Sequence, residues 1–466
     1  MIQTSRIQTL CEAPPRNEAD YVLYWMQQSQ RAVFNPALEI AVEEANARDL
    51  PVLVGFGLTA RYPEANARHY AFLLQGLQDV ASRLAERGIG FVVRLGEPPD
   101  VALELSRRGA IVVCDRGYLK PQVAWRRTLA IAAEVRVLQV EGDAVVPVEV
   151  ASTKHEFAAR TIRPKIQRRM DEFIEPLEPR PLRRRWAGPT PAGLSLRETA
   201  PVLQALGVDN AVPPVKRFTG GYGEARRRLD AFLEDGFSRY GAQRGKPEAA
   251  AASHMSPYLH YGHISPVEIA LAVRAAAHAQ SEDRTSYLEE LIVRRELAIN
   301  HVAFEPAYDS YAAVPEWARK TLAAHALDPR PHLYTPDEFE AGATHDRYWN
   351  AAMLEMRATG YMHNHLRMYW GKKVLEWSAR PEQAFETLLR LNNRWFLDGR
   401  DANSFMNVGW IFGLHDRPWG PQPVFGTVRS MGRNTFRKFD ADAYVRVVEA
   451  LAAHEGHSGR LAAGAV

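Results

Sequence analysis

The sequence is poor in cysteine, with only Cys11 and Cys114 among its 466 residues. Two thiols cannot build a disulfide framework or a cysteine-rich zinc site, so both of these classes are excluded. The sequence also lacks any run of about 18 apolar residues, and residues 1–16 lack the apolar core of a secretory signal. We therefore expect a soluble, cytoplasmic protein in a reducing compartment, with no membrane partner.

The sequence also has no large excess of positive or negative charge, since it contains 58 Lys and Arg and 55 Asp and Glu. The formal net charge of +3 gives no argument for a nucleic-acid partner, so any basic patch must be local. Apolar residues make up 46% and charged residues 24%, which excludes a long disordered, collagen-like or coiled-coil chain. The length predicts two or three domains.

Tryptophan, by contrast, is abundant. Seven of the ten tryptophans lie between Trp317 and Trp419. One interpretation is a large helical core, because indole fills apolar space well; the other is a site that uses indole chemistry or stacking. The count by itself leaves both open.

Short β-rich runs alternate with helical stretches over the first 150 residues. The predicted strands are Tyr21–Tyr24, Pro51–Phe56, Gly90–Leu95, Ala110–Asp115 and Val135–Val140, and the predicted helices are Asn35–Asp49, Glu64–Arg87, Pro98–Arg107 and Lys120–Ala133. This alternation is typical of βαβ units with a parallel sheet, whose ligands bind beyond the carboxyl ends of the strands. The loops Trp25–Phe34 and Gly57–Asn66 are therefore candidate ligand loops. No GxGxxG follows the first strand, which disfavours dinucleotide binding.

The organisation changes after residue 150. Residues 153–185 carry ten Lys and Arg against five acids, interrupted by prolines, and we interpret them as a solvated basic segment entering an extended linker. Strand signals then fade, and helical periodicity recurs at Glu224–Asp235, Pro266–Ala279, Thr285–His301, Asp346–Gly360, His365–Ser378 and Pro381–Asn392. We predict an α/β domain over 1–175, an extended linker over 176–217 and an all-α domain over 218–466.

Five motifs in the helical half combine polar and aromatic residues. They are Tyr240–Arg244, Ser253–Leu259, Glu290–Glu296, Met362–Met368 and Asp398–Asn403. Each has an ordinary explanation when taken alone, such as a helix cap at Ser256 or an i,i+4 surface pair between Glu290 and Arg294. His363 and His365 do not share a helix face, and no further ligand completes a site, so metal binding is not expected.

Together and in this order, the motifs resemble the FAD-binding half of the photolyase/cryptochrome family. Tyr21–Gln30 and Pro63–Asn66 are similar to class II cyclobutane-pyrimidine-dimer photolyases, as are Thr153–Lys154, Ala158–Pro164, Met368–Trp377 and Pro423–Arg429. The resemblance covers nearly the whole chain. It implies a parallel-sheet, Rossmann-like antenna-type domain followed by an all-α FAD-binding domain. It also implies light-driven repair of pyrimidine dimers by electron transfer from excited, reduced FAD to a flipped-out dimer.

The resemblance carries roles over to particular residues around the flavin. The residues matching the phosphate-binding positions are Tyr240, Ala252, Ser253, His254, Met255 and Ser256. Asn392 matches the asparagine at flavin N5, and Arg367 and Asp398 match a salt-bridged pair close to the ring. Arg400 and Asp401 would lie at its pyrimidine edge.

Roles toward the DNA follow in the same way. Glu290 matches a glutamate that hydrogen-bonds the dimer, and it could stabilise the reactive state only if its carboxyl donates a proton. The residues matching the cavity wall are Met368 and Trp410, and those matching DNA contacts are Arg244, Asn364, His365 and Arg429. The class I tryptophan that follows this glutamate is absent, since Val293 and Arg294 stand there.

Three tryptophans are candidates for an electron relay. Trp370 and Trp377 are two helical turns apart, about 10.5 Å along one face, and Trp349 lies on the preceding predicted helix. The spacing alone does not distinguish an electron relay from three tryptophans packed in a core. The class II resemblance implies a photoreduction chain in which Trp370 is nearest the flavin and Trp349 is the middle step.

The resemblance further implies ultraviolet-damaged DNA, single- or double-stranded, as partner of a monomer, and a possible second antenna chromophore of the deazaflavin or folate class. Three alternatives stay open. A cryptochrome-like photoreceptor is disfavoured because no long extension follows the Asp398 motif. A 6-4 photolyase is disfavoured because Asn364 separates His363 from His365. A dark flavin oxidoreductase is the third.

Overall fold

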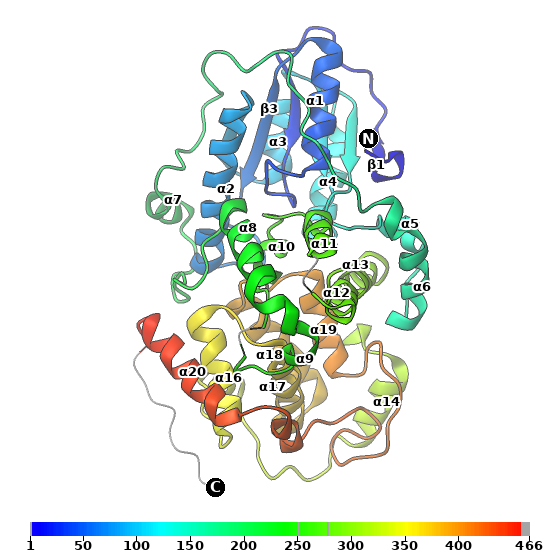
Figure 1. Cartoon of the computed structure of the whole chain (residues 1–466), viewed down its shortest axis with the longest axis vertical. Helices are drawn as coiled ribbons and strands as arrows, with labels where there is room; N and C mark the ends of the chain where they lie inside the picture. Colours follow the sequence, from blue (N-terminus) through cyan, green and yellow to red (C-terminus); the bar gives the residue numbers. More distant parts are fainter. Residues whose placement is uncertain (1, 250, 277–278, 458–466) are drawn as a thin grey trace.

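The computed structural model describes residues 2–249, 251–276 and 279–457. An α/β part containing the N-terminus is stacked on a helical part that contains the C-terminus (Figure 1). None of the helices in these ranges is both long and apolar enough to cross a bilayer.

A six-stranded sheet forms the centre of the α/β part, in the order β1-β6-β5-β2-β3-β4. The strands are β1 (Ile7–Cys11), β2 (Tyr21–Trp25), β3 (Val52–Leu58), β4 (Gly90–Leu95), β5 (Gly109–Asp115) and β6 (Val137–Val140). All neighbours pair in parallel except β1, which is antiparallel to β6. The five predicted strands are confirmed. Strand β1 was not predicted, because a half-exposed edge strand has no continuous apolar run.

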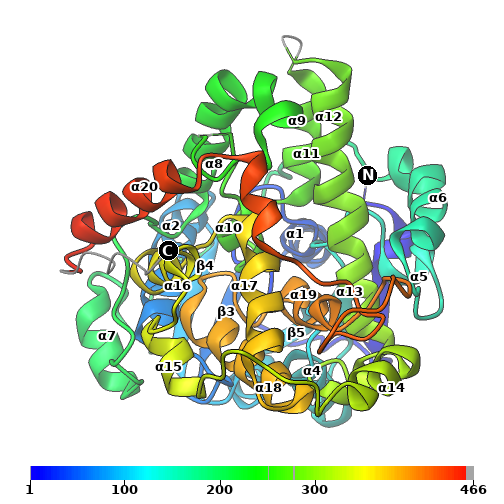
Figure 2. The ribbon, with the colours of Figure 1, turned by 90° about the horizontal axis from the view of Figure 1, so that it is seen from below.

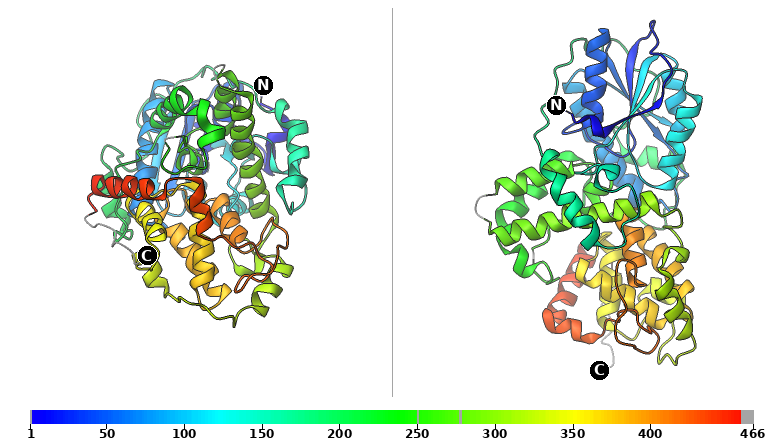
Figure 3. Two further views of the ribbon diagram at one scale, coloured as in Figure 1. Left: turned by 60° about the horizontal axis from the view of Figure 1, so that its bottom comes forward. Right: turned by 90° about the vertical axis from the view of Figure 1, so that its right-hand side faces the viewer.

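Helices cover both faces of this sheet (Figure 3). They are α1 (Pro36–Arg48), α2 (Ala67–Glu86), α3 (Pro98–Ser106) and α4 (Lys120–Ala132), each within three residues of its prediction. The side chain of Asn35 accepts hydrogen bonds from the backbone N–H groups of Ala37 and Leu38 and so caps α1. Because they are covered on both faces, β2, β3 and β5 are buried throughout and consist mostly of apolar residues.

The first part of the basic segment 153–185 is helical, and no helix was predicted there. After α5 (Val148–Ala151) it forms α6 (Ala159–Arg169) and the turn η2 (Met170–Glu172). Ala159, Ile162 and Ile166 are buried on one face of α6. Burial of this face outweighs the hydrogen bond that Pro164 cannot make.

The predicted linker 176–217 contains α7 (Thr199–Leu206) and runs along the outside of the α/β part (Figure 1). It is attached to the sheet, since the backbone N–H of Leu194 donates to Val93 of β4. The domain limits 1–175, 176–217 and 218–466 stay a prediction, and residues 458–466 lie outside the described ranges.

The second half of the chain is helical, as predicted. Its elements are α8 (Tyr222–Ala231), η3 (Phe232–Gly236), η4 (Phe237–Arg239), α9 (Tyr240–Gln243), α10 (Ser256–His260), α11 (Pro266–Ala275), α12 (Ser281–Leu288), η5 (Glu289–Arg294), α13 (Arg295–Phe304), η6 (Tyr311–Ala313), α14 (Glu316–Ala324), α15 (Pro336–Ala341), α16 (Arg347–Thr359), α17 (Asn364–Trp377), α18 (Pro381–Trp395), α19 (Ala402–Ile411), η7 (Arg433–Lys438) and α20 (Ala441–His454). The prediction for α11 extended to Ala279, across residues 277–278 that lie outside the described ranges. Seen from below, α17 and α19 lie near the middle of this half, and α12 and α20 lie nearer its edge (Figure 2).

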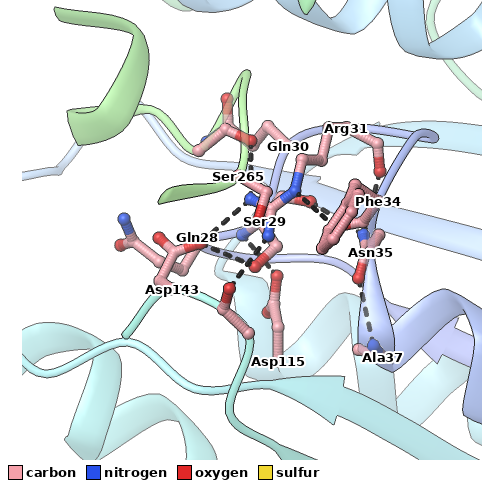
Figure 4. Close-up of polar contacts among 12 residues, drawn as sticks. Gln28, Ser29, Gln30, Arg31, Phe34, Asn35, Ala37, Asp115, Asp143 and Ser265 are labelled. Atoms are coloured by element: carbon pink, nitrogen blue, oxygen red, sulfur yellow. Dashed lines mark hydrogen bonds and ion pairs between the residues drawn. The ribbon is translucent and has the colours of Figure 1, made fainter. Parts of the chain in front are cut away.

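A buried polar network joins the two parts at the carboxyl ends of β2 and β5 (Figure 4). The carboxylate of Asp115 accepts from the backbone N–H groups of Gln27 and Ser29, at 2.8 and 2.5 Å. Arg31 is fully buried and donates to Asp143 at 3.0 Å and to the carbonyl of Gly262 at 2.9 Å. The loop after β2 is therefore bound to both the sheet and the helical part.

Candidate active site

A cavity of about 500 Å³, here called the large cavity, lies in the helical part. All five motifs contribute to its wall, through Tyr240, Ser253, Met255, Ser256, Glu290, Asn364, Arg367, Asp398 and Asp401, and Trp410 and Arg429 line it as well. Its size is that of a cofactor or ligand site. Segments separated by up to about two hundred residues in the sequence thus form one site, as the resemblance implies.

The expected ion pair between Arg367 and Asp398 is formed. Arg367 Nη2 lies 2.9 and 3.1 Å from the two carboxylate oxygens, and Nε donates to the carbonyl of Met362. The guanidinium carbon is 4.1 Å from the ring centroid of Phe396. Charge, hydrogen bonds and stacking together hold this planar cation in one orientation at the wall.

Hydroxyl groups and aromatic rings gather at another part of the wall. Tyr287 donates to the hydroxyl of Ser253 at 3.0 Å, and the rings of Tyr240 and Tyr287 are 5.2 Å apart. Ser256 begins α10, where it lines the same cavity. This part of the wall offers hydroxyl groups to an anionic ligand.

Glu290 does not form the i,i+4 pair with Arg294 that its helix would allow. Its carboxylate lies 2.7 Å from Arg244 Nη1, and both side chains are about 40% exposed. Arg294 instead pairs with Glu289. The reason is the wider turn of η5, which moves Arg294 off the i,i+4 face and leaves Glu290 directed at the cavity wall.

Trp349 contacts both of the other candidate relay tryptophans. The rings of Trp349 and Trp377 are 6.1 Å apart, and the indole N–H of Trp349 donates to the carbonyl of Trp370 at 3.0 Å. All three side chains are buried. Trp349 is therefore the middle member of these three residues, here called the tryptophan row, and their role as a relay stays a prediction.

Apart from the three relay tryptophans, seven candidate residues are not among the described residues that line the large cavity: Arg244, Ala252, His254, His365, Met368, Asn392 and Arg400. Asn392 is buried and donates to Asn393. His365 contacts Thr435. Arg400 has a left-handed backbone (φ 61°) and donates to Tyr261 and to the carbonyl of Asn393, so it lines a different cavity. Its expected place at the pyrimidine edge of the flavin stays a prediction.

Several wall residues were missed by the sequence analysis. Asn403 and Asn407 lie one helical turn apart on α19 and line the cavity together with Trp410, which was predicted. Amides on one face of an otherwise apolar helix were the available signal. Tyr287 and Tyr361 gave no signal, because buried tyrosines are ordinary core residues.

A second cavity of about 110 Å³, here called the small cavity, lies at the carboxyl ends of β2 and β3. Its wall includes Gln27, Gln30 and Tyr62, which come from the two loops predicted to bind a ligand. Both side-chain polar atoms of Gln27 and the Oε1 atom of Gln30 are buried without a partner among the described residues. The rings of Tyr62 and Trp125 approach to 5.8 Å beside them.

The two cavities share three wall residues, His260, Arg295 and Asp401. His260 Nδ1 lies 3.2 Å from a carboxylate oxygen of Asp401, which also caps α19 through the backbone N–H of Asn403. Burial opposes ionisation of Asp401, but the hydrogen bond and charge of His260 outweigh it and lower the pKa to about 2. A charged, hydrogen-bonded partition therefore separates the cavities.

Known proteins resemble this chain in sequence and in fold. A family model described as DNA photolyase matches residues 22–182. The chain is 43% identical to a deoxyribodipyrimidine photo-lyase of Methanothermobacter thermautotrophicus over 97% of this chain and 99% of that protein. It is 38% identical to the one of Oryza sativa subsp. japonica, over 92% and 88% of the two chains.

Solved structures confirm the expected fold. A class III photolyase from Agrobacterium tumefaciens superposes with a TM-score of 0.71 at 20% identity, covering 92% of this chain and 86% of that one. An archaeal photolyase from Sulfolobus tokodaii, described with two FAD molecules, gives a TM-score of 0.67 at 14% identity over 91% and 89%. With 43% identity over nearly the full length of both chains, this chain belongs to the DNA photolyase family.

Proposed function

We propose that this chain repairs cyclobutane pyrimidine dimers in DNA in a light-dependent reaction, as a deoxyribodipyrimidine photo-lyase. The observation that carries the proposal is the convergence of all five motifs on the large cavity. The names of the relatives that match over nearly their whole lengths support the same activity. Neither a photoreceptor nor a 6-4 photolyase is favoured by these relatives.

The wall of the large cavity fits FAD. Ser253 and Ser256 supply hydroxyl groups suited to the phosphates, and the rigid Arg367–Asp398 pair is suited to a polar ring system. When bound, reduced flavin supplies the electron on excitation by light. The role of the protein is to position and to shield the flavin. We propose that Tyr240, Met255 and Asp401 also contact the FAD. For Ala252, His254, Asn392 and Arg400, a contact with the FAD is proposed from the family resemblance alone.

The substrate is proposed to reach the cavity as a flipped-out dimer, because a stacked lesion inside a duplex cannot enter it. Arg429 is exposed at the wall, and Arg244 is exposed beside Glu290 of the wall. Both suit backbone phosphates, and Asn364 offers a polar contact. Glu290 and Trp410 are proposed to face the lesion. For Met368 and His365, which lie off this wall, such roles rest on the resemblance alone.

We further propose that the enzyme is of class II. The segments similar to that class carry this assignment. The contacts of Trp349 with Trp377 and with the backbone of Trp370 support it, because they suit a relay that reduces the flavin. The replacement of the class I tryptophan by Val293 and Arg294 agrees with this assignment. A cytoplasmic location suits an enzyme whose substrate is DNA, and we propose a monomer, which light scattering can test.

A second chromophore is proposed for the small cavity. The unpartnered amide atoms of Gln27 and Gln30 suit a ring with hydrogen-bonding edges, and the rings of Tyr62 and Trp125 suit a planar conjugated face. A deazaflavin or a folate meets both requirements. Extraction and absorption spectroscopy of purified protein, before and after addition of each pigment class, would identify it.

The proposed activity is tested by dimer loss in ultraviolet-treated DNA, measured in blue light and in darkness with reductant present. We expect one FAD per chain and repair only in light. DNA that carries only 6-4 photoproducts is the control and should stay unrepaired. Equal repair in darkness would contradict the mechanism, and repair of 6-4 photoproducts alone would contradict the substrate.

A further inference from the structure

Three histidines from separate segments meet beside the large cavity. His155 lies between α5 and α6, His301 lies on α13, and His415 lies in the loop after α19. One ring nitrogen of each lies within 4.8 Å of those of the other two. Nδ1 of His301 and Nε2 of His155 are 3.1 Å apart. The proposed repair reaction uses none of these side chains.

Hydrogen bonding leaves lone pairs available in this cluster. Nδ1 of His415 donates to the carbonyl of Phe157 at 2.9 Å, so its Nε2 carries the lone pair. That Nε2 and Nε2 of His301 are both buried without a partner in the described part of the chain. A backbone carbonyl on one ring nitrogen is the contact that orients metal-binding imidazoles, and an unpartnered buried nitrogen calls for a ligand.

The three imidazoles are also neutral near pH 7. Burial lowers the pKa of His301 to about 3 and of His415 to about 4, and it lowers the pKa of His155 as well. Neutral imidazole is the form that binds metal ions.

The backbone around the cluster is held in place. The side chain of Asn300 accepts from the backbone N–H of Glu156 at 2.7 Å and donates to the carbonyl of Lys154 at 2.9 Å. Both neighbours of His155 are thus attached to α13, next to His301. The carbonyl of Phe157 in turn holds His415. The site is assembled without rearrangement of the chain.

We propose that His155, His301 and His415 bind one zinc-class divalent cation, with a water molecule in the fourth position. Three neutral nitrogen ligands without thiolate or carboxylate suit zinc better than softer or harder cations. One ring nitrogen of each side chain lies within 4.8 Å of those of the other two, which brings all three within reach of one cation. The cation cross-links the end of the α/β part to the loop of His415 and Asp416, which lines the large cavity.

Zinc binding is measured on the untagged, flavin-containing protein by equilibrium dialysis with metal analysis, and by thermal unfolding. We expect one zinc per chain and a higher Tm with zinc than with chelator. His155→Gln should weaken zinc binding at least about tenfold and remove the zinc-dependent rise in Tm. This side chain is partly exposed, so glutamine leaves the packing intact.

His301→Phe is the second variant, because phenylalanine keeps the volume of the buried ring and removes its nitrogens. His454→Gln is the matched control, since His454 is exposed on α20 and should leave zinc binding unchanged. Bound flavin in each variant reports folding independently of the metal. The proposal is overturned if the native protein holds no zinc, or if either ligand variant holds as much as the native protein.

Discussion

The carboxylate of Glu290, at the wall of the large cavity, lies 2.7 Å from Arg244, and both side chains are partly exposed. An exposed pair of this kind contributes little to stability, so its role can be tested without unfolding the protein. The two residues have different proposed tasks, since one faces the lesion and the other faces a phosphate. Their variants should therefore affect different steps.

We expect Glu290→Ala to lower the quantum yield of repair more than it lowers affinity for damaged DNA. The carboxyl faces charge that develops only after electron transfer, and a lost hydrogen bond is worth about 1–3 kcal/mol. Glu290→Gln keeps a hydrogen-bond donor and should retain more of the yield. Both quantities are measured on one ultraviolet-damaged oligonucleotide.

Arg244→Ala is the companion variant. It should weaken binding and reduce the slope of affinity against salt by about one, because one phosphate contact is lost. If Glu290→Ala also only weakens binding, with normal yield at saturation, then Glu290 serves the ion pair and not the reaction.

At the scale of elements, α16 packs against α17. Trp349 of α16 thereby contacts the ring of Trp377 and the backbone carbonyl of Trp370, the other two members of the row. Seven-residue spacing on α17 places Trp370 and Trp377 on one face, but the packing of α16 against that face supplies the middle ring. The relay is thus a property of two packed helices.

We expect Trp370→Phe to block photoreduction of oxidised flavin while chemically reduced enzyme still repairs dimers. The row only recharges the flavin, whereas repair begins from flavin that is already reduced. Transient absorption measures the first activity and dimer loss the second. Trp395→Phe on α18 is the control, since Trp395 is equally buried but outside the row. Equal loss of both activities in Trp370→Phe would show a structural role.

At the scale of the whole molecule, the turn between α10 and α11 attaches the helical part to the loop after β2. Gly262 has φ 67°, and a Cβ there would lie 2.0 Å from the carbonyl oxygen of Gln28. Its own carbonyl accepts from Arg31. Close contact between the two parts therefore requires glycine at this position.

Gly262→Ala should lower the free energy of unfolding by more than the roughly 1 kcal/mol of a left-handed alanine, measured by denaturant unfolding. Gly207→Ala is the matched control, because Gly207 has φ 62° but nothing within 4 Å of a built Cβ. Equal losses in the two variants would mean that strain in the backbone, and not the interface, explains the effect.

Glu296 of α13 makes a second contact between the parts. Its carboxylate accepts from the backbone N–H groups of Val145 and Val146, and burial raises its pKa to about 8. Since the folded pKa lies above the unfolded value of about 4.5, its stabilising contribution is full below pH 4.5 and is lost as pH rises to about 8.

Glu296→Gln should remove this dependence, because the amide oxygen still accepts a hydrogen bond but cannot ionise. We expect the Tm of the variant minus that of the native protein to increase between pH 5 and 8. Glu282→Gln, at an exposed position of α12, is the control and should show a constant difference. A constant difference for Glu296→Gln would refute the raised pKa.

Local periodicity in the sequence determined the order of strands and helices in the first 150 residues and the helical character of the second half. These patterns are visible because buried residues recur every two residues along a strand and every three to four residues along a helix. Strand β1 and helix α6 were not predicted. Strand β1 is a half-exposed edge strand, and helix α6 combines a short apolar face with Pro164 and many charged residues.

The tertiary structure alone decided which side chains meet. The sequence allowed Glu290 to pair with Arg294, but the wide turn of η5 and the approach of α9 pair it with Arg244. Arg400, whose backbone is left-handed, lines the small cavity. The cluster of His155, His301 and His415 joins residues more than one hundred positions apart. Such contacts depend on packing between distant segments, which leaves no periodic trace in the sequence.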